Sequence, residues 1–207
     1  MTADLIHVFD DLVPEWLYQN TLKNIAQVPV TFGHSGLGPY QGHSLFSRVW
    51  RTGEIASVPW YLTATFECFK SQGHRLGELA DISMSQCQIN MSTQNLNGGL
   101  HVDSNPQAPA WTMVHMIAGD SGMDFWTALP EQAGTLIRQV DYRDNRCVVF
   151  PSALLHRGLP PTAVEPRVTV GYIFSGTSPS QFASRNNIIF PIFRKEYDRI
   201  MQGGSNG

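Results

Sequence analysis

The chain has 207 residues and a mass of 23.0 kDa, which is the size of one domain with at most a short appended segment. Only 15% of the residues are charged, whereas about 25% is usual, and the formal net charge is -3. This balance disfavours a nucleic-acid-binding protein, because such proteins usually carry a basic surface. Hydrophobic residues make up 42% of the chain, which suffices for a sizeable core and argues against wholesale disorder.

The cysteines and the N-terminus bear on the compartment. Cys68, Cys87 and Cys147 are far apart and odd in number, so we expect buried thiols that act as small hydrophobic side chains rather than a disulfide framework. The first residues, MTADLIHVFDD, are acidic and contain no basic stretch, so no signal peptide is predicted. No apolar run approaches the ~20 residues that a membrane helix needs. We therefore expect a cytoplasmic protein without a membrane segment.

The first eighty residues are predicted to form a helical layer and a loop. Ile6, Val8 and Phe9 indicate a short strand, and a helix follows with Asp10 or Asp11 as its cap and Pro14 in its first turn. Four apolar residues then recur at roughly helical spacing: Leu17, Leu22, Ile25 and Val28.

A Gly-rich stretch separates this helix from a second one. Residues 31–44, TFGHSGLGPYQGHS, are predicted to be irregular, and residues 31–48, with Tyr40, His43 and Arg48, are a candidate lid over a binding site. The stretch from Trp60 to Phe69 is predicted to be helical, with Leu62, Phe66 and Phe69 on one side.

From residue 82 onward the pattern changes to short strands separated by turn residues. The segment Ile82–Met91 alternates with period two, and five further strands are predicted at Trp111–Ala118, Met123–Ala128, Leu136–Val140, Arg146–Pro151 and Arg167–Ser175. Short strands at close and regular spacing favour a β-sandwich, jelly roll or barrel, with the N-terminal helices packed against it. The tail from Gln202 to Gly207 is predicted to be a flexible end.

The segment GGLHVDSNP contains the first two candidate metal ligands. His101 and Asp103 are two residues apart, so on an extended chain their side chains point to the same face. His156 follows the hydrophobic stretch CVVFP and is the third candidate. Two histidines and one carboxylate with open coordination positions form the facial ligand set that suits non-haem Fe(II). The same ligand types also serve zinc hydrolases, although the HExxH helix that those enzymes usually contain is absent from this sequence.

Arg167 lies eleven residues after His156, at the start of the predicted strand RVTVGYIF. A guanidinium binds a carboxylate through a planar pair of hydrogen bonds. We therefore expect Arg167 to hold the far end of a dicarboxylate whose near end chelates the metal.

These residues resemble the motif of the iron(II)- and 2-oxoglutarate-dependent dioxygenases, in particular their prolyl-4-hydroxylase-like branch. That motif is HxD, some fifty residues, a second His and then a basic residue, and here 52 residues separate Asp103 from His156. The stretches QINMSTQNLNGGLHVD, SGMDFW and IHVFDDLVPEW are similar to other parts of the family. The resemblance covers most of residues 1–176 and implies a mainly β fold with a double-stranded β-helix core, also called a jelly roll or cupin-like core.

Carried over to this chain, the resemblance implies Fe(II), 2-oxoglutarate and O₂ as cofactor and co-substrates. His101, Asp103 and His156 would bind the iron, and Arg167 would bind the distal carboxylate of 2-oxoglutarate. The reaction implied is hydroxylation of an aliphatic C–H bond, coupled to decarboxylation of 2-oxoglutarate to succinate and CO₂.

Three further residues are candidates for the co-substrate pocket. Thr169 follows Arg167 by two residues on the same strand face, and Asn90 matches a polar family position, with Gln88 on its face. The family often places a Tyr on the strand after HxD, but the strand WTMVHMIAG has none. His115 or Met116 holds the matching place, so His115 is a candidate for this pocket and, alternatively, a core histidine with a hydrogen-bond partner.

Other polar and aromatic residues receive more ordinary interpretations. Arg157 should point away from His156 to the surface, with a substrate-facing role as the alternative, and Asp124 is expected on a solvated face or else at the pocket mouth. Trp111 and Trp126 are expected in the core. His7, His34, His43 and His74 are expected to be solvent-exposed or structural.

The organisation expected is a single oxygenase domain over residues 1–207, with a helical layer and lid loop (1–80), a β-helix core (81–176) and a C-terminal segment (177–207). A monomer or weak dimer acting on a small molecule or a prolyl or peptide substrate is expected, with nucleic acid disfavoured. Two alternatives remain open: a metal-dependent cupin-like enzyme that does not use 2-oxoglutarate, and a catalytically silent β-helix domain that binds a partner.

Overall fold

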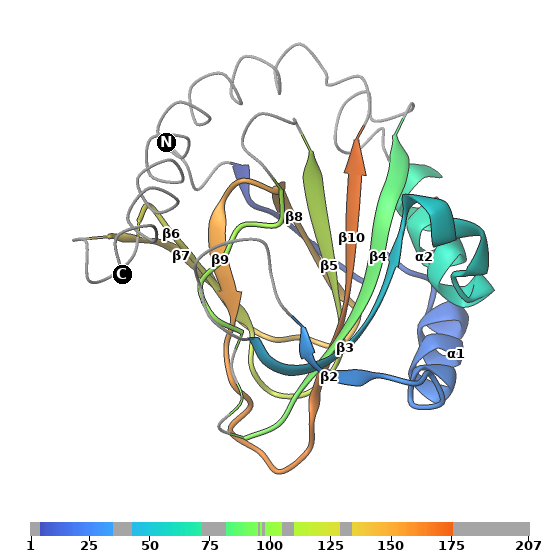
Figure 1. Cartoon of the computed structure of the whole chain (residues 1–207), viewed down its shortest axis with the longest axis horizontal. Coiled ribbons are helices and arrows are strands. Elements are labelled where there is room, and N and C mark those ends of the chain that lie inside the picture. The colour runs from blue at the N-terminus through green and yellow to red at the C-terminus, as the bar shows by residue number, and fades with distance from the viewer. Residues whose placement is uncertain are drawn as a thin grey trace.

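The computed structural model describes residues 5–34, 43–71, 82–94, 96, 98–104, 110–128 and 134–175. Two antiparallel sheets lie face to face, and two helices cover the outer side of the larger sheet (Figure 1). The fold is mainly β and is the double-stranded β-helix that the sequence predicts. The larger sheet has seven strands in the order β1 (His7–Asp10), β8 (Arg146–Pro151), β5 (Trp111–Ala118), β10 (Arg167–Ser175), β4 (Ser83–Ser92), β3 (His43–Arg51) and β2 (Thr31–His34).

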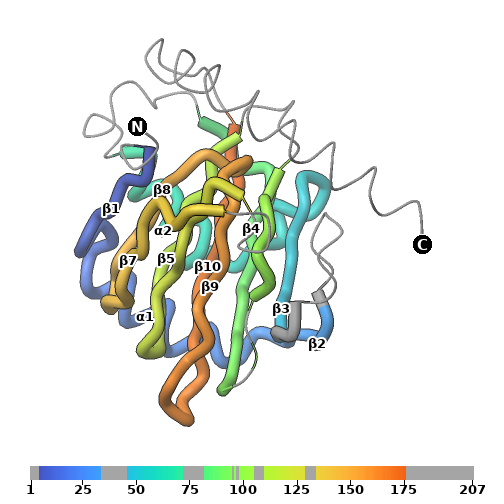
Figure 2. Tube along the Cα trace, turned by 90° about the vertical axis from the view of Figure 1, so that its left-hand side faces the viewer, coloured from blue at the N-terminus to red at the C-terminus, as the bar shows by residue number. Residues whose placement is uncertain are grey.

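The smaller sheet has three strands in the order β7 (Leu136–Val140), β6 (Met123–Trp126) and β9 (Leu155–Gly158). Figure 2, turned to face the side of the smaller sheet, shows β5, β10, β4 and β3 following one another across the larger one. The helices are α1 (Glu15–Ile25), the 3-10 helix η2 (Thr52–Ser57) and α2 (Trp60–Ser71).

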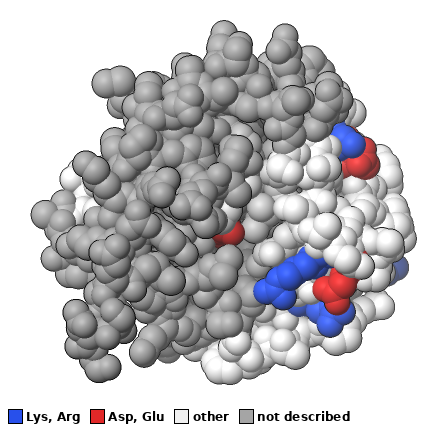
Figure 3. Space-filling view, turned by 45° about the horizontal axis from the view of Figure 1, so that its top comes forward, with Lys and Arg blue, Asp and Glu red and all other residues white. Residues whose placement is uncertain are grey.

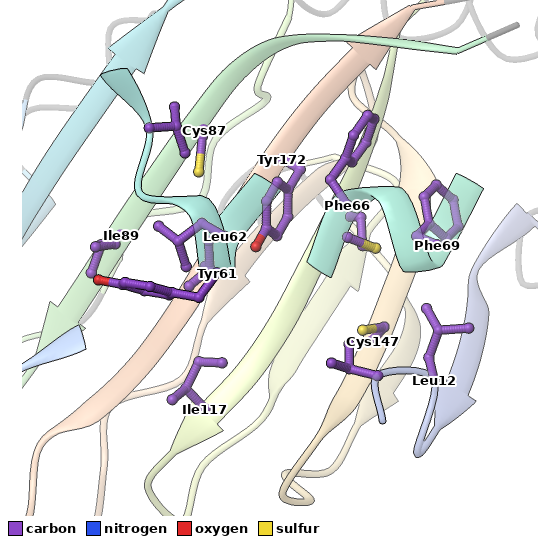
Figure 4. Packing of buried hydrophobic residues seen from close by; sticks show 14 of the residues in the cluster. Leu12, Tyr61, Leu62, Phe66, Phe69, Cys87, Ile89, Ile117, Cys147 and Tyr172 are labelled. Carbon is purple, nitrogen blue, oxygen red and sulfur yellow. The ribbon is translucent and has the colours of Figure 1, made fainter. Parts of the chain in front are cut away.

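The outer face of the larger sheet and the helices enclose the first hydrophobic core. Cys87 and Ile89 on β4 and Tyr172 on β10 point toward α2, which contributes Leu62, Phe66 and Phe69 (Figure 4). The ring of Phe66 stacks on that of Tyr172 with centroids 5.8 Å apart. Because successive strand residues alternate between faces, this packing sends the next residues of β4 and β10 to the inner face of the sheet.

The inner faces of the two sheets enclose a second core. It combines Val114 and Met116 of β5 and Val148 and Phe150 of β8 with Met123 and Phe125 of the smaller sheet. Strand β5 is therefore buried on both sides, which explains why its sequence is apolar almost throughout. Farther along the same inner face, β4 presents half-buried amide side chains instead of apolar ones.

Helix α1 begins differently from the prediction. Its N-cap is Pro14, and no side chain caps it. Asp10 and Asp11 form ion pairs with Arg143 instead, and Asp10 also pairs with Arg146. The prediction of an Asp cap was wrong because long-range ion pairs hold both carboxylates at the junction of β1 with the turn before β8. The hydroxyl of Tyr18 ties the helix to β5 by donating to the carbonyl of Ile117 over 2.8 Å.

The N-terminal third contributes more strand than the sequence predicts. Both ends of the expected irregular loop over residues 31–44 belong to the larger sheet, since β2 pairs with β3, which pairs with β4. Arg48 faces outward with its guanidinium over the ring of Trp50, so it lies away from the inner face where a lid over the site would act. Tyr40 lies outside the described residues. The Gly residues hid this hairpin because they weaken the periodic strand signal.

The remaining predicted elements agree with the structure. The strands over Trp111–Ala118, Leu136–Val140, Arg146–Pro151 and Arg167–Ser175 have the predicted bounds, and α2 begins at Trp60. Cys87 and Cys147 are buried thiols, and Cys68 is half-buried. In the described part of the chain, no helix is long and apolar enough to cross a membrane.

The described surface carries few charges. On the face drawn in Figure 3, the basic side chains lie beside acidic ones. His74 and the segment 177–207, which includes the tail, lie outside the described residues.

Candidate metal centre

His101, Asp103 and His156 come together at one end of the space between the two sheets. His156 lies on β9, a short strand that the sequence did not predict, and His101 pairs with it through reciprocal backbone hydrogen bonds of 2.9 and 3.0 Å. The backbone N–H of Asp103 donates to the carbonyl of Ser152 over 2.8 Å. The chain around the HxD motif is thus fixed to the segment between β8 and β9, which places the two halves of the motif side by side.

The three side chains present their ligand atoms to one point. Nε2 of His101 lies 3.4 Å from Oδ1 of Asp103, and Nε2 of His156 lies 3.5 Å from its Oδ2. The imidazole rings are 4.4 Å apart between centroids. Two ligands of one metal ion, each about 2.1 Å from it, lie about 3 to 3.5 Å apart. The spacing of these three residues therefore fits a single metal ion.

The backbone selects the tautomer that each histidine needs for metal binding. Nδ1 of His101 lies 2.8 Å from the carbonyl of Gly99, and Nδ1 of His156 lies 2.8 Å from the carbonyl of Leu154. A carbonyl can only accept, so both Nδ1 atoms carry the proton and both Nε2 atoms keep a lone pair directed at the site. This arrangement is what a pair of neutral imidazole ligands requires.

Asp103 is held as a carboxylate. Its Oδ2 accepts a 2.7 Å hydrogen bond from the hydroxyl of Thr112 on β5, which also contacts the hydroxyl of Ser152 over 2.8 Å. Burial raises the pKa of Asp103, but the two imidazoles and the Thr112 hydroxyl together lower it by more, so the net pKa is well below the usual value. The ligand is therefore ionised over the whole physiological range.

The surroundings of His156 keep it neutral. Its ring is buried, with those of Phe150 and Phe125 at centroid distances of 4.6 and 6.0 Å. Burial lowers the pKa of His156 to about 4, and the neighbouring Asp103 only partly opposes this. For His101 burial also lowers the pKa, but Asp103 outweighs burial and the net pKa is raised.

Arg167 is buried at the first residue of β10, and its guanidinium lies on the same side of β9 as His156. Its Nε donates to the carbonyl of Ser121 over 2.8 Å, and its side chain is 6% exposed. A Cβ placed on Gly158, two residues after His156, would lie 2.6 Å from its Nη1. Burial lowers the pKa of Arg167 to about 10, so it remains charged. Within the described residues no salt bridge joins it to a carboxylate, so the guanidinium is a buried cation without a carboxylate partner there.

Two of the three further pocket candidates lie on the inner face. Thr169 is directly opposite Asn90 in the β10–β4 pairing, and Arg167 is opposite Ser92. Met116, opposite Thr169 on β5, points to the same side and holds the place expected for the family's Tyr.

His115 lies on the other face of β5, so its prediction as a pocket residue was wrong. Its Nε2 contacts Oδ1 of Asn145 over 3.0 Å, and its ring lies 6.1 Å from that of Tyr18 under α1. The alternative interpretation, a core histidine with a hydrogen-bond partner, is the one that the structure supports. Neighbouring residues of β5 point to opposite faces, and the helices cover the face that carries His115. Met116 is therefore the residue that points to the inner face.

The Asp124–Arg157 pair corrects one expectation about the surface. Asp124 is 4% exposed, and its carboxylate accepts hydrogen bonds from Nε and Nη2 of Arg157 at 2.9 to 3.1 Å. The solvated face predicted for Asp124 was therefore wrong. Both residues point to the side of the smaller sheet opposite to Phe125 and His156, because Asp124 and Arg157 are directly paired across β6 and β9. Trp111 is a core residue as predicted, and Trp126 packs partly buried beside Arg157.

Several residues of the site were not found from the sequence. Thr112 holds the carboxylate of Asp103, Ser152 contacts the hydroxyl of Thr112, and Gly158 makes room for Arg167. Gly158 had a usable signal, because it follows His156 by two residues and shares its strand face. Thr112 and Ser152 had none, since small hydroxyl residues are common at such positions in any sheet.

The donor set fits a divalent transition metal. Two neutral nitrogen ligands and one carboxylate, with ligand atoms within 4.8 Å of one another, form the ligand set typical of non-haem iron. No protein-family model matches the sequence, and no curated protein is significantly similar to it.

Solved structures, in contrast, match over most of the chain. The non-haem alpha-ketoglutarate-dependent epimerase SnoN from nogalamycin biosynthesis superposes with a TM-score of 0.62 at 12% identity, over 86% of this chain and 82% of its own. A 2OG-Fe(II) oxygenase family protein from Burkholderia pseudomallei gives 0.57 at 18% identity, over 83% and 85%. A prolyl hydroxylase from Trichoplax adhaerens, in complex with a hypoxia inducible factor peptide fragment, gives 0.53 at 13% identity, over 85% and 88%.

The chain has the fold of the 2-oxoglutarate- and iron-dependent oxygenases. At identities of 12 to 18%, this similarity concerns the oxygenase fold.

Proposed function

We propose that this protein is an Fe(II)- and 2-oxoglutarate-dependent dioxygenase that hydroxylates an aliphatic C–H bond of a small molecule or of a prolyl or peptide substrate. The residues proposed to bind iron are His101, Asp103 and His156. Arg167 is proposed to bind the distal carboxylate of 2-oxoglutarate, with Thr169 and Asn90 beside it. We further propose that the whole chain is one cytoplasmic oxygenase domain.

One observation carries the proposal: a facial ligand set faces the same space as a buried guanidinium that has no carboxylate partner among the described residues. A charged group removed from water without a counter-ion is costly, so its persistence indicates a site for an anionic ligand. The triad alone is compatible with other metal enzymes. The combination with Arg167 favours a co-substrate that chelates a metal at one end and carries a carboxylate at the other.

The residues of the chain have separate tasks in this reaction. The backbone carbonyls of Gly99 and Leu154 hold both imidazoles with Nε2 directed at the proposed metal. Thr112 holds Asp103 by one carboxylate oxygen. Arg167 orients the co-substrate, and the rings of Phe125 and Phe150 keep water from one side of His156. When bound, Fe(II) supplies the activation of O₂ that is coupled to decarboxylation of 2-oxoglutarate to succinate and CO₂.

Anaerobic binding tests the cofactor assignment. Adding Fe(II) and then 2-oxoglutarate should produce the visible metal-to-ligand charge-transfer band of a chelated complex. The band should be absent in His156→Ala, and Arg167→Ala should need far more 2-oxoglutarate to reach it while binding metal normally. Arg143→Ala, which removes an exposed arginine that pairs with Asp10 and Asp11 and contacts none of the three proposed metal ligands, is the matched control. Absence of the band in the wild type would refute the proposal.

A second experiment tests hydroxylation itself. The turnover mixture should contain Fe(II), 2-oxoglutarate, ¹⁸O₂ and a panel of prolyl peptides and free amino acids. Hydroxylation places one ¹⁸O atom in the product and one in succinate. Substrate conversion with label in succinate alone would support 2-oxoglutarate chemistry but not hydroxylation, and conversion without succinate would favour a cupin-like enzyme that does not use 2-oxoglutarate.

A further inference from the structure

The inner face of the larger sheet changes character between β5 and β4. On β5 and β8 it is apolar and packs against the smaller sheet. On β4 it carries Gln86, Gln88 and Asn90, three half-buried amides at alternate positions. Gly171 of β10 lies between Val114 and Gln88 in the register, and a Cβ on it would meet nothing closer than 3.9 Å. The absent side chain leaves open space between the apolar half and the amides.

The three amides form a directional chain of hydrogen bonds. Nε2 of Gln86 donates to Oε1 of Gln88 over 3.1 Å, and Nε2 of Gln88 donates to Oδ1 of Asn90. Within the described residues no other hydrogen bond engages Oε1 of Gln86 or Nδ2 of Asn90. The chain of amides therefore ends as an acceptor at Gln86 and as a donor at Asn90.

The two ends lie at opposite ends of the proposed site. Asn90 is directly opposite Thr169, and the next residue on the same face of β4, Ser92, is opposite Arg167. The donor of Asn90 therefore lies beside the proposed carboxylate site. Gln86 is opposite Ile173, which is opposite Thr112, the residue that donates to Asp103. With strands about 4.8 Å apart, Gln86 lies roughly 10 Å from Thr112 along the same face.

The direction of the amide chain is coupled to the anion. If all three amides turned over, Oδ1 of Asn90 would face the carboxylate, and two acceptors would repel each other. An anion beside Arg167 and Thr169 thus favours the observed direction. Because Gln88 is hydrogen-bonded to both neighbours, the same direction leaves Oε1 of Gln86 as the acceptor at the other end of the chain.

We propose that Gln86, Gln88 and Asn90 form a relay by which bound 2-oxoglutarate sets Gln86 as a hydrogen-bond acceptor for the substrate. The substrate class that this relay fits carries an amide N–H or a hydroxyl, and not a carboxylate, roughly 10 Å or less from the carbon that reacts. The inference rests on the proposed function, because 2-oxoglutarate is the anion that sets the direction.

The relay is tested with Zn(II)-loaded protein, which binds without turnover, and ¹⁵N side-chain amide spectra. Adding 2-oxoglutarate should shift the amide signals of both Asn90 and Gln86 in the wild type. In Gln88→Met, which keeps the volume but interrupts the chain, the signal of Asn90 should shift and that of Gln86 should not. Gln88→Glu should weaken 2-oxoglutarate binding more than Gln88→Met, because its carboxylate draws the donor of Asn90 away from the ligand. Equal shifts at Gln86 in wild type and Gln88→Met overturn the relay.

The substrate class is tested with a matched pair, N-acetyl-L-prolinamide and N-acetyl-L-proline. With Zn(II) and 2-oxoglutarate present, the amide should bind about fivefold or more tightly than the acid, and Gln86→Met should abolish the preference. Equal binding, or binding of neither compound, overturns the assigned class. If calorimetry finds no binding of 2-oxoglutarate to the wild type, the proposed function fails and the relay fails with it. If 2-oxoglutarate binds and the pair is not distinguished, only the inference about the substrate fails.

Discussion

The guanidinium of Arg167 lies directly against Gly158, on the strand that carries His156. A Cβ on Gly158 would fall 2.6 Å from Nη1 and 3.0 Å from Cζ of that arginine. The proposed metal ligand His156 and the glycine against which the proposed carboxylate-binding residue packs therefore lie on one short strand, β9. Their relative position depends on the absence of a single methyl group.

Gly158→Ala should displace the guanidinium and weaken 2-oxoglutarate binding by about tenfold or more, since a bidentate contact tolerates little misplacement. Metal affinity should be unchanged, because the triad does not contact this methyl group. Isothermal titration of the Zn(II)-loaded protein measures both. Gly53→Ala is the control, since a Cβ there meets nothing within 4 Å. Normal 2-oxoglutarate affinity in Gly158→Ala would argue against the role of Arg167.

Thr112→Val removes the hydroxyl that donates to Asp103 while keeping the shape of the side chain. We expect metal affinity to fall about 10- to 100-fold, the usual effect of losing a hydrogen bond that orients a ligand. Thr112→Ser keeps the hydroxyl and should retain most of the affinity. Competition for Co(II) against a chromophoric chelator gives the affinities, and equal values for the valine and serine variants would contradict this account.

His115 should make folding stability depend on pH. Nδ2 of Asn145 donates to the carbonyl of Val13, so its Oδ1 faces Nε2 of His115, which is the protonated nitrogen. Nδ1 is buried and has no hydrogen-bond partner among the residues that the structure describes. Burial therefore lowers the pKa of His115 to about 4, from an unfolded value near 6.5.

Because the unfolded state takes up this proton first, the contribution of His115 is complete above pH 6.5 and disappears as the pH falls to about 4. The loss is on the order of 3 kcal/mol. In urea titrations of metal-free protein, His115→Gln should lose less stability than the wild type between pH 7 and 4. Tyr18→Phe, altered on the same packed face without a group that titrates in this range, should keep the wild-type slope. A wild-type slope in His115→Gln would exclude His115 as the source.

Asp124→Asn should lower the free energy of unfolding by about 1–3 kcal/mol, because it replaces a buried, charge-assisted pair with Arg157 by a weaker contact. Metal affinity should change little, since the pair projects from the opposite side of β6 and β9 to His156. Chemical denaturation and metal titration of the same variant separate the two effects. A large loss of metal affinity without loss of stability would show that the pair acts on the site instead.

Much of this molecule was readable from local patterns. Period-two alternation located β4, short runs between turn residues located β5, β7, β8 and β10, and the spacing of His101, Asp103, His156 and Arg167 indicated a common site. The hairpin of β2 and β3 was missed because Gly residues weaken the strand pattern there. The pairing of β3 with β4, which lies far along the chain, also leaves no local signal. Strand β9 was missed for a similar reason, since four residues are too few to show a period.

The sequence by itself determined the ligand types, their order and the mainly β character, because these follow from residue chemistry and from alternation along single strands. Only the tertiary structure decided which face each side chain occupies. The helices cover one side of β5, so His115 is a core residue and Met116 faces the site. In the same way, cross-strand pairing buries Asp124 against Arg157 and places Gly158 beside Arg167, since contacts between distant strands depend on register and leave no periodic trace in the sequence.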